Sequence, residues 1–254
     1  MTTALITGGT AGIGKAFAAE LAGSGYHLVL VARDAARLDT VAEELRGRGA
    51  PEVETLPADL STTQGRAAVE DRLRDADRPV DLLINNAGFG LGKAFSESSV
   101  EDEETLIDVH VRATMRLTHA ALPGMIERKR GAVVNVASVA AFVPRGTYSA
   151  AKAWIVSFSE SVAAEVHGTG VRCMALCPGF THTEFHQRAN VPTSDIPNWM
   201  WLNADDVVKA GMRDLRRGVP VSIPGAQYKA LTAASRYVPR SITTRLSRAR
   251  SKRW

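Results

Sequence analysis

The strongest constraint on the fold is a glycine-rich run near the start of the sequence, Thr7-Gly8-Gly9-Thr10-Ala11-Gly12-Ile13-Gly14. An apolar stretch at residues 4–7 precedes it and alanine-rich sequence follows, so the run is predicted to join a strand to a helix. Free backbone amides and the dipole at a helix N-terminus favour a negatively charged group, and glycine lets that group come close. The run therefore predicts a phosphate-binding turn with contacts from Gly8, Thr10, Gly12, Ile13 and Gly14. A glycine-rich turn without a ligand is the alternative.

Short apolar runs recur along the chain, separated by amphipathic segments such as residues 35–46 and 62–74. This alternation predicts an α/β fold, a Rossmann-type doubly wound parallel sheet of about seven strands in three layers, α/β/α. The expected strands are residues 4–7, 27–32, 53–57, 81–84, 132–137, 171–177 and 219–223.

The length of 254 residues fits one such domain, which we place at residues 1–225. An irregular stretch rich in Pro, Trp and Asn, residues 185–203, is expected to form a lid over a substrate within that domain. Residues 226–254 form a predicted basic helical extension.

Charge is distributed unevenly, because residues 215–254 contain ten Lys or Arg and no Asp or Glu. Within the extension, Ile242, Leu246 and Ala249 recur at helical spacing between arginines. Such a helix could lie on an anionic membrane surface, dock on the acidic body of its own or a partner subunit, or fray. No nucleic-acid recognition motif accompanies the charge, so no nucleic-acid partner is predicted.

Other patterns exclude several classes of protein. The first residues lack the features of a secretory signal and no apolar run could cross a bilayer, so a cytoplasmic protein is expected. Cys173 and Cys177 are predicted to be reduced, buried thiols. The run His182-Thr183-Glu184-Phe185-His186 places its glutamate one position late for a zinc-protease motif, so no metal site is predicted.

Four motifs in order resemble those of the short-chain dehydrogenase/reductase family: the glycine run, Asn85-Asn86-Ala87-Gly88, Tyr148-x-x-x-Lys152 and Pro178-Gly179. The resemblance covers roughly residues 3–224. It implies that residues 1–225 form an NAD(P)-binding catalytic domain, which transfers a hydride between a nicotinamide and a small carbonyl or alcohol substrate. The apolar residues of the irregular stretch favour an apolar substrate. It also implies cofactor contacts from Asp59, Leu60, Asn86, Ala87, Gly88, Tyr148, Lys152, Pro178, Gly179, Thr181 and Thr183.

The second predicted strand ends at Ala32-Arg33, where an acidic residue would select NAD(H) by binding the ribose 2′-hydroxyl. Arginine at that position suits a 2′-phosphate instead, so NADP(H) is favoured over NAD(H). A solvated Arg33 paired with Asp34 is the alternative. The family's other basic marker, before the second glycine of the turn, is absent because Ala11 stands there.

Tyr148 and Lys152 are four residues apart in a predicted helix over residues 148–167, so their side chains share one face. A neighbouring ammonium would lower the pKa of the phenol and let Tyr148 act as general acid and base. By resemblance, Ser138 orients the substrate oxygen. A plain surface pair is the alternative.

Two departures from the family pattern concern the neighbours of Tyr148. Ser138 lies ten residues before Tyr148, closer than is common in the family. His110 stands where the family usually has asparagine, and it could serve as a proton relay or be a packed helix histidine.

The rival to an enzyme is a regulatory or scaffold protein that binds NADP(H) without turnover; the triad of Ser138, Tyr148 and Lys152 favours the enzyme. Family resemblance also implies a homodimer or homotetramer assembled through the helices at residues 101–122 and 148–167.

Overall fold

A computed structural model describes residues 2–144, 146–189 and 196–237. Its strands are β1 (Thr3–Thr7), β2 (His27–Ala32), β3 (Val53–Pro57), β4 (Leu82–Asn85), β5 (Gly131–Val136), β6 (Val171–Leu176) and β7 (Val221–Ser222). Within these residues they form one sheet in the order β3-β2-β1-β4-β5-β6-β7, with every neighbouring pair parallel. The predicted doubly wound sheet is thus confirmed, and each expected strand lies within a few residues of its predicted position.

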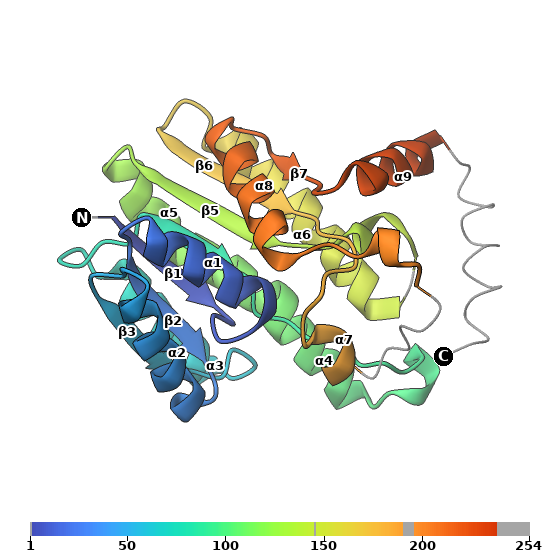
Figure 1. Cartoon of the computed structure of the whole chain (residues 1–254), viewed down its shortest axis with the longest axis horizontal. Helices are drawn as coiled ribbons and strands as arrows, with labels where there is room; N and C mark the ends of the chain where they lie inside the picture. The colour runs from blue at the N-terminus through green and yellow to red at the C-terminus, as the bar shows by residue number, and fades with distance from the viewer. Residues whose placement is uncertain (1, 145, 190–195, 238–254) are drawn as a thin grey trace.

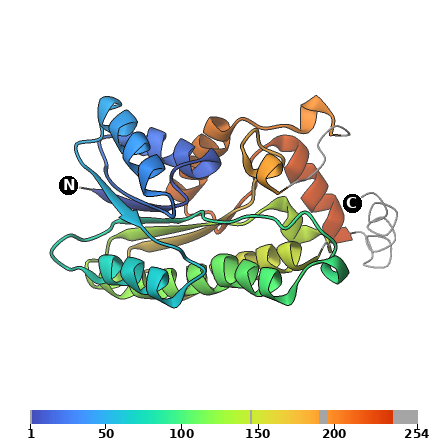
Figure 2. The same ribbon diagram turned by 90° about the horizontal axis from the view of Figure 1, so that it is seen from below.

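Helices cover both faces of the sheet, giving the predicted three layers (Figures 1 and 2). One layer holds α1 (Gly12–Gly23), α2 (Ala35–Gly47) and α8 (Ala204–Arg216), and the opposite layer holds α3 (Thr63–Arg74), α5 (Ala113–Glu127) and α6 (Gly146–Glu165). The remaining helical elements are α4 (Val100–Ile107), α7 (Phe185–Arg188), α9 (Ala226–Tyr237), and the short turns η1 (Phe95–Glu97), η2 (Asp108–Arg112), η3 (Val139–Phe142) and η4 (Asn198–Met200).

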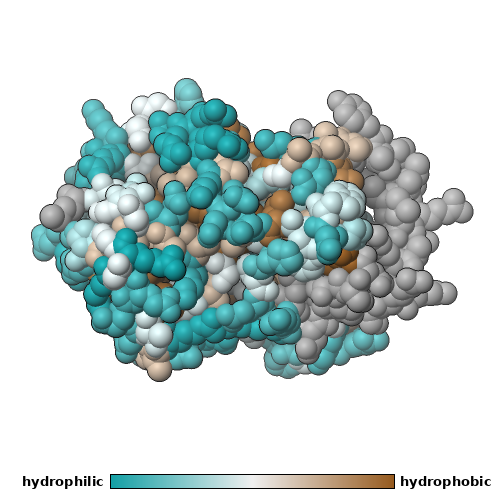
Figure 3. All heavy atoms as spheres, in the orientation of Figure 1, coloured by the Kyte–Doolittle hydropathy of each residue, from teal (hydrophilic) through white to brown (hydrophobic). Residues whose placement is uncertain are grey.

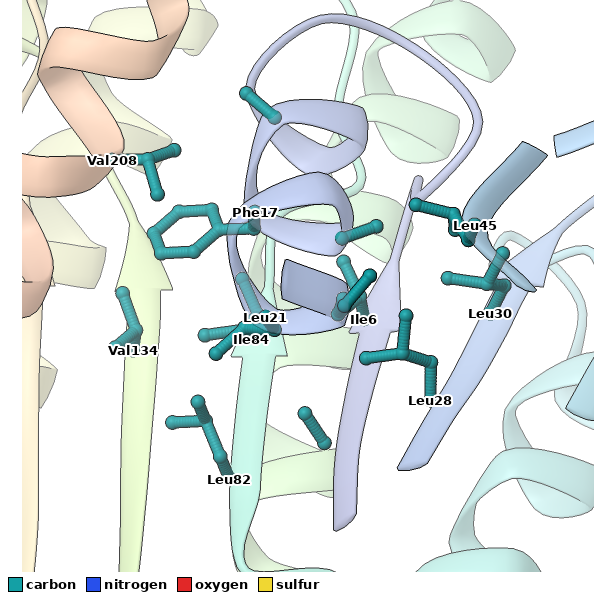
Figure 4. Packing of buried hydrophobic residues seen from close by; sticks show 14 of the residues in the cluster. Ile6, Phe17, Leu21, Leu28, Leu30, Leu45, Leu82, Ile84, Val134 and Val208 are labelled. Atoms are coloured by element: carbon teal, nitrogen blue, oxygen red, sulfur yellow. The ribbon is translucent and has the colours of Figure 1, made fainter. Parts of the chain in front are cut away.

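The hydrophobic core divides between the two faces because successive strand residues point to opposite sides. Ile6 and Leu30 pack with Phe17 of α1 in one cluster, whereas Leu5 and Val29 belong to the cluster under α3 and α5. Figure 4 shows Phe17 pointing from α1 between Val134 and Val208. The phenyl ring is fully buried, so it anchors the helix that follows the glycine run.

On the face shown in Figure 3, hydrophilic residues cover most of the surface, and hydrophobic ones emerge between the part carrying α1 and α8 and the part carrying α9. No helix among the described residues is long and apolar enough to span a membrane. The predicted tail helix with Ile242, Leu246 and Ala249, and residues 190–195 of the predicted lid, lie outside the described residues.

Candidate active site

The strand order reverses between β1 and β4, and the residues after these two strands meet at the carboxyl edge of the sheet. Thr7 Oγ1 accepts hydrogen bonds from Asn86 N at 2.9 Å and Ala87 N at 3.0 Å. Asn86 Nδ2 donates to Thr7 O at 2.9 Å and to Gly8 O at 3.2 Å. Open α/β sheets bind ligands at such a reversal point. Asn86 therefore ties the glycine turn to the neighbouring strand.

The glycine turn has the form that a phosphate requires. Gly8 and Gly12 have φ angles of 65° and 52°, which favour glycine. A Cβ on Gly14 would lie 2.2 Å from Gly8 O, so no side chain fits there. At the N-terminus of α1, Ala11 is the cap residue and no side chain caps the helix. In contrast, Asp34 caps α2 by accepting from Arg37 N. The cradle and the uncapped amides fit a cofactor pyrophosphate.

Arg33 and Asp59 follow the adjacent strands β2 and β3 at the same edge. Arg33 is exposed, and its charge helps lower the pKa of Asp59, as do the hydrogen bonds from Ser61, whereas desolvation opposes the shift. Asp59 Oδ1 accepts from Ser61 N at 2.9 Å and from Ser61 Oγ at 2.7 Å. Leu60 is buried beside it. A solvent-facing guanidinium thus lies at the carboxyl edge of the sheet, after the strand next to the one that leads into the glycine turn.

Tyr148 and Lys152 lie in the first turns of α6, as the spacing predicts, beside Ser138 at the end of β5. The hydroxyl of Ser138 forms a hydrogen bond with Tyr148 and also caps η3, accepting from Ala140 N at 3.1 Å. Lys152 Nζ donates to Val136 O at 2.7 Å and lies 5.7 Å from the centre of the Tyr148 ring. The short spacing from Ser138 to Tyr148 therefore still brings the three side chains together.

The pKa values of this pair differ from the expectation. Burial raises the pKa of Tyr148 to about 12, while the Ser138 hydrogen bond opposes the rise. Burial also lowers the pKa of Lys152 to about 7, because its ammonium lies in the core and donates to a neutral carbonyl, whereas the nearby Cys177 thiol opposes the shift. The direction is opposite to the expected lowering of the Tyr148 pKa by Lys152, because burial of the phenol has the largest influence on it.

His110 lies in η2, a wide π-type turn between α4 and α5, and is 1% exposed. Its Nε2 lies 3.0 Å from Phe89 N and 2.8 Å from Phe89 O, and the tautomer decides which bond forms. Its ring meets the Tyr148 ring edge-on at 5.5 Å. Burial and the charge of Lys152 hold the His110 pKa well below its ordinary value, so the ring is neutral. Its Nδ1 has no hydrogen-bond partner among the described residues.

The segment after β6 crosses this site. Thr183 lies against the glycine turn, 3.1 Å from the position of a Cβ on Gly12. Phe185 of α7 packs its ring on Tyr148, with 5.8 Å between ring centres. Glu184 pairs with Arg37, whose Nε donates to Thr10 O at 3.2 Å. The segment after β6 therefore extends from the glycine turn to Tyr148.

A family model for short chain dehydrogenases matches residues 2–193. The chain belongs to the short-chain dehydrogenase family. It is thus an oxidoreductase, and the predicted family is confirmed.

Individual relatives agree with this assignment. A short chain dehydrogenase of Pseudocercospora fijiensis is 40% identical over 189 residues, covering 72% of this chain and 60% of that protein, so this chain spans less than two thirds of that relative. A short-chain dehydrogenase from Sphingobium yanoikuyae in complex with NADPH superposes with a TM-score of 0.85 and 36% identity over 93% of this chain and 94% of that one. A bulky-bulky ketone specific alcohol dehydrogenase from Comamonas testosteroni has a TM-score of 0.81 and 30% identity, over 93% and 92% of the two chains.

In this short-chain dehydrogenase, the residues singled out from the sequence follow the carboxyl ends of β1 to β6 or face them from α1, η2 and α6. Pro178 O accepts a hydrogen bond from Val139 N at 3.0 Å, and Thr181 Oγ1 donates one to Gly179 O at 3.0 Å. Pro178 and Thr181 therefore both form hydrogen bonds that hold the backbone around the turn after β6. No group of three or more potential metal ligands occurs among the described residues.

Sequence reasoning missed Arg37, which carried a weak signal as a second arginine four residues after Arg33. It placed Phe185 only within the predicted lid, because the contact with Tyr148 joins residues that are remote in the sequence.

Proposed function

We propose that this short-chain dehydrogenase reduces ketones or aldehydes with NADPH, with Tyr148 as the proton-transferring residue. The observation that carries the proposal is the meeting of Tyr148, Ser138 and Lys152 beside an uncapped glycine turn. A bound NADPH would supply the hydride, held by the turn residues Gly8, Thr10, Gly12, Ile13 and Gly14, by Arg33, Asp59 and Leu60, by Asn86, Ala87 and Gly88, and by Tyr148, Lys152, Pro178, Gly179, Thr181 and Thr183.

The raised pKa of Tyr148 suits the reductive direction. A phenol with a pKa of about 12 is protonated at neutral pH, so it can donate its proton to a substrate oxygen that becomes alkoxide-like. Ser138, already hydrogen-bonded to Tyr148, would hold that oxygen in place. Lys152 would remain available to bind the ribose of the nicotinamide half.

His110 is proposed as a neutral hydrogen-bond relay behind Tyr148. Its unpartnered Nδ1 and its contact with the Tyr148 ring support this role. The lowered pKa favours transfer through a neutral imidazole over a charged one.

Two observations support the choice of cofactor and substrate. No acidic residue stands at the end of β2, where Arg33 follows, and the similar Sphingobium yanoikuyae protein was solved in complex with NADPH. The ring of Phe185 packs on Tyr148, and the ring of Trp201 packs on Phe180 in the same segment after β6. The similar Comamonas testosteroni enzyme is specific for bulky-bulky ketones. We therefore propose a bulky, apolar ketone as substrate. Several further properties stay predictions: homo-oligomerisation, a cytoplasmic location, the lid over residues 185–203, the division at residue 225 and membrane contact by the tail.

The decisive experiment is NADPH oxidation against a panel of ketones and aldehydes, with Tyr148→Phe as the control. We expect turnover with bulky ketones and a loss of at least about a hundredfold in the variant, because a general acid contributes roughly that much. The His110→Ala variant should lose activity, whereas His110→Asn, which keeps a hydrogen-bonding side chain, should retain most of it. If the protein binds NADPH but turns over none of the substrates, that result would favour the alternative of a regulatory or scaffold protein without catalytic activity.

A further inference from the structure

Tyr228 of α9 joins two segments that are distant in the sequence. Its side chain is 2% exposed. Its Oη accepts a hydrogen bond from Phe180 N at 2.9 Å and donates one to Met200 O at 2.6 Å. A single phenol thus satisfies a backbone donor just after β6 and a backbone acceptor at the end of η4.

The ring of Tyr228 also fills the space beside Gly179. A Cβ on Gly179 would lie 2.0 Å from ring atoms of Tyr228, so that position must remain glycine for the ring to fit. The neighbouring Gln227 adds a weaker bond, from Nε2 to Trp199 O at 3.3 Å. Helix α9 therefore contacts both segments through adjacent residues.

The same two segments are paired with each other next to Tyr228. Leu202 N donates to Phe180 O at 2.8 Å, and His182 N donates to Leu202 O at 3.0 Å. The His182 ring stacks on Trp201 at 4.6 Å. The turn after β6 is consequently held from two sides, by its pairing with Leu202 and by the phenol of Tyr228.

This turn leads directly into the candidate active site. Thr183 lies against Gly12 of the glycine turn, and Phe185 lies on the Tyr148 ring. Any shift of Gly179 and Phe180 would move these contacts, whereas the glycine turn and Arg33 are held by other strands.

We propose that Tyr228 is a positioning residue, which holds the turn at Gly179 and Phe180 in the place that accepts the nicotinamide half of the cofactor. The proposal rests on the proposed NADP(H)-dependent function. Helix α9 would then contribute to cofactor binding indirectly, by holding the turn, without itself contacting the cofactor.

The test is the substitution Tyr228→Phe, which keeps the ring against Gly179 and removes both hydrogen bonds. Dissociation constants are measured for NADPH and for adenosine 2′,5′-bisphosphate, which carries only the adenine and 2′-phosphate half. We expect the NADPH constant to rise about tenfold, since two half-buried backbone groups lose their partner, while the constant for the fragment stays the same. The KM for NADPH should rise with it, and kcat at saturating NADPH should change little.

Tyr26→Phe serves as the matched control, because Tyr26 directly precedes β2 at the amino edge of the parallel sheet, whereas the turn after β6 lies at the carboxyl edge, and it should leave both constants unchanged. Equal weakening of NADPH and the fragment by Tyr228→Phe would show general destabilisation and overturn the proposal, and so would no change in either constant. If the unsubstituted protein binds neither molecule, the proposed function itself is wrong and this inference falls with it.

Discussion

At the level of single residues, burial rather than charge pairing sets the pKa values of Tyr148 and Lys152, the proposed catalytic pair. Tyr148 and Lys152 share a helix face, yet Lys152 Nζ bonds to the Val136 carbonyl. A neutral partner compensates poorly for the loss of water around an ammonium. The lysine therefore has a lowered pKa and the tyrosine a raised one in the absence of cofactor.

The lowered pKa of Lys152 makes stability depend on pH. From about 7 up to its ordinary value of 10.5, the unfolded chain binds the proton and the folded chain does not. The contribution of Lys152 to the free energy of unfolding is therefore lowest below pH 7 and rises with pH through this window, by up to about 1.4 kcal/mol per pH unit. Denaturant titrations of the cofactor-free protein should show Lys152→Met more stable than the parent at neutral pH, with the difference shrinking as the pH rises toward about 9. A difference that is constant over this range would contradict the assigned burial.

Arg33 is predicted to select the cofactor through its charge. Arg33→Ala should weaken NADPH binding by about 1.5–3 kcal/mol, roughly tenfold to a hundredfold, because the 2′-phosphate loses charge-assisted hydrogen bonds. NADH binding should hardly change. Titrations of both cofactors check this, with the exposed Arg48→Ala as a control of equal charge. An equal loss for both cofactors would argue against contact with a 2′-phosphate.

At the level of elements, two local irregularities shape the candidate active site. Helix α1 begins at Gly12 without a side-chain cap, which leaves amides for a phosphate. The π-type turn η2 turns His110 inward toward Phe89 and Tyr148. Such turns within helices are frequent at functional sites, because they displace one residue from the regular helical spacing.

The stretch containing α7 and η4 is the element predicted to close over substrate. Trp199 is 63% exposed and should become shielded on closure. Adding a ketone to the protein with bound NADP⁺, where no hydride is available, should change tryptophan emission. The change should be largely lost in Trp199→Phe and kept in Trp154→Phe, since Trp154 stacks on Phe158 of α6. An emission change that survives Trp199→Phe would contradict closure at this residue.

At the level of the whole molecule, the parallel sheet gathers residues from many parts of the chain at one edge. The glycine turn follows β1, Asn86 follows β4, Ser138 follows β5 and Gly179 follows β6. Parallel strands all end on the same side, so motifs in sequence order become neighbours in space. The fold and the position of the site were predictable for this reason.

The sequence by itself determined the features that depend on local periodicity. Alternating apolar runs specified the strands and their covering helices, the glycine run specified the turn between β1 and α1, and helical spacing put Tyr148 and Lys152 on one face. Tertiary structure alone decided the pKa values, which follow from burial, and the bond between Phe180 and Tyr228, 48 positions apart. Contacts at such separation depend on how the finished layers pack, and no periodicity along the chain records them.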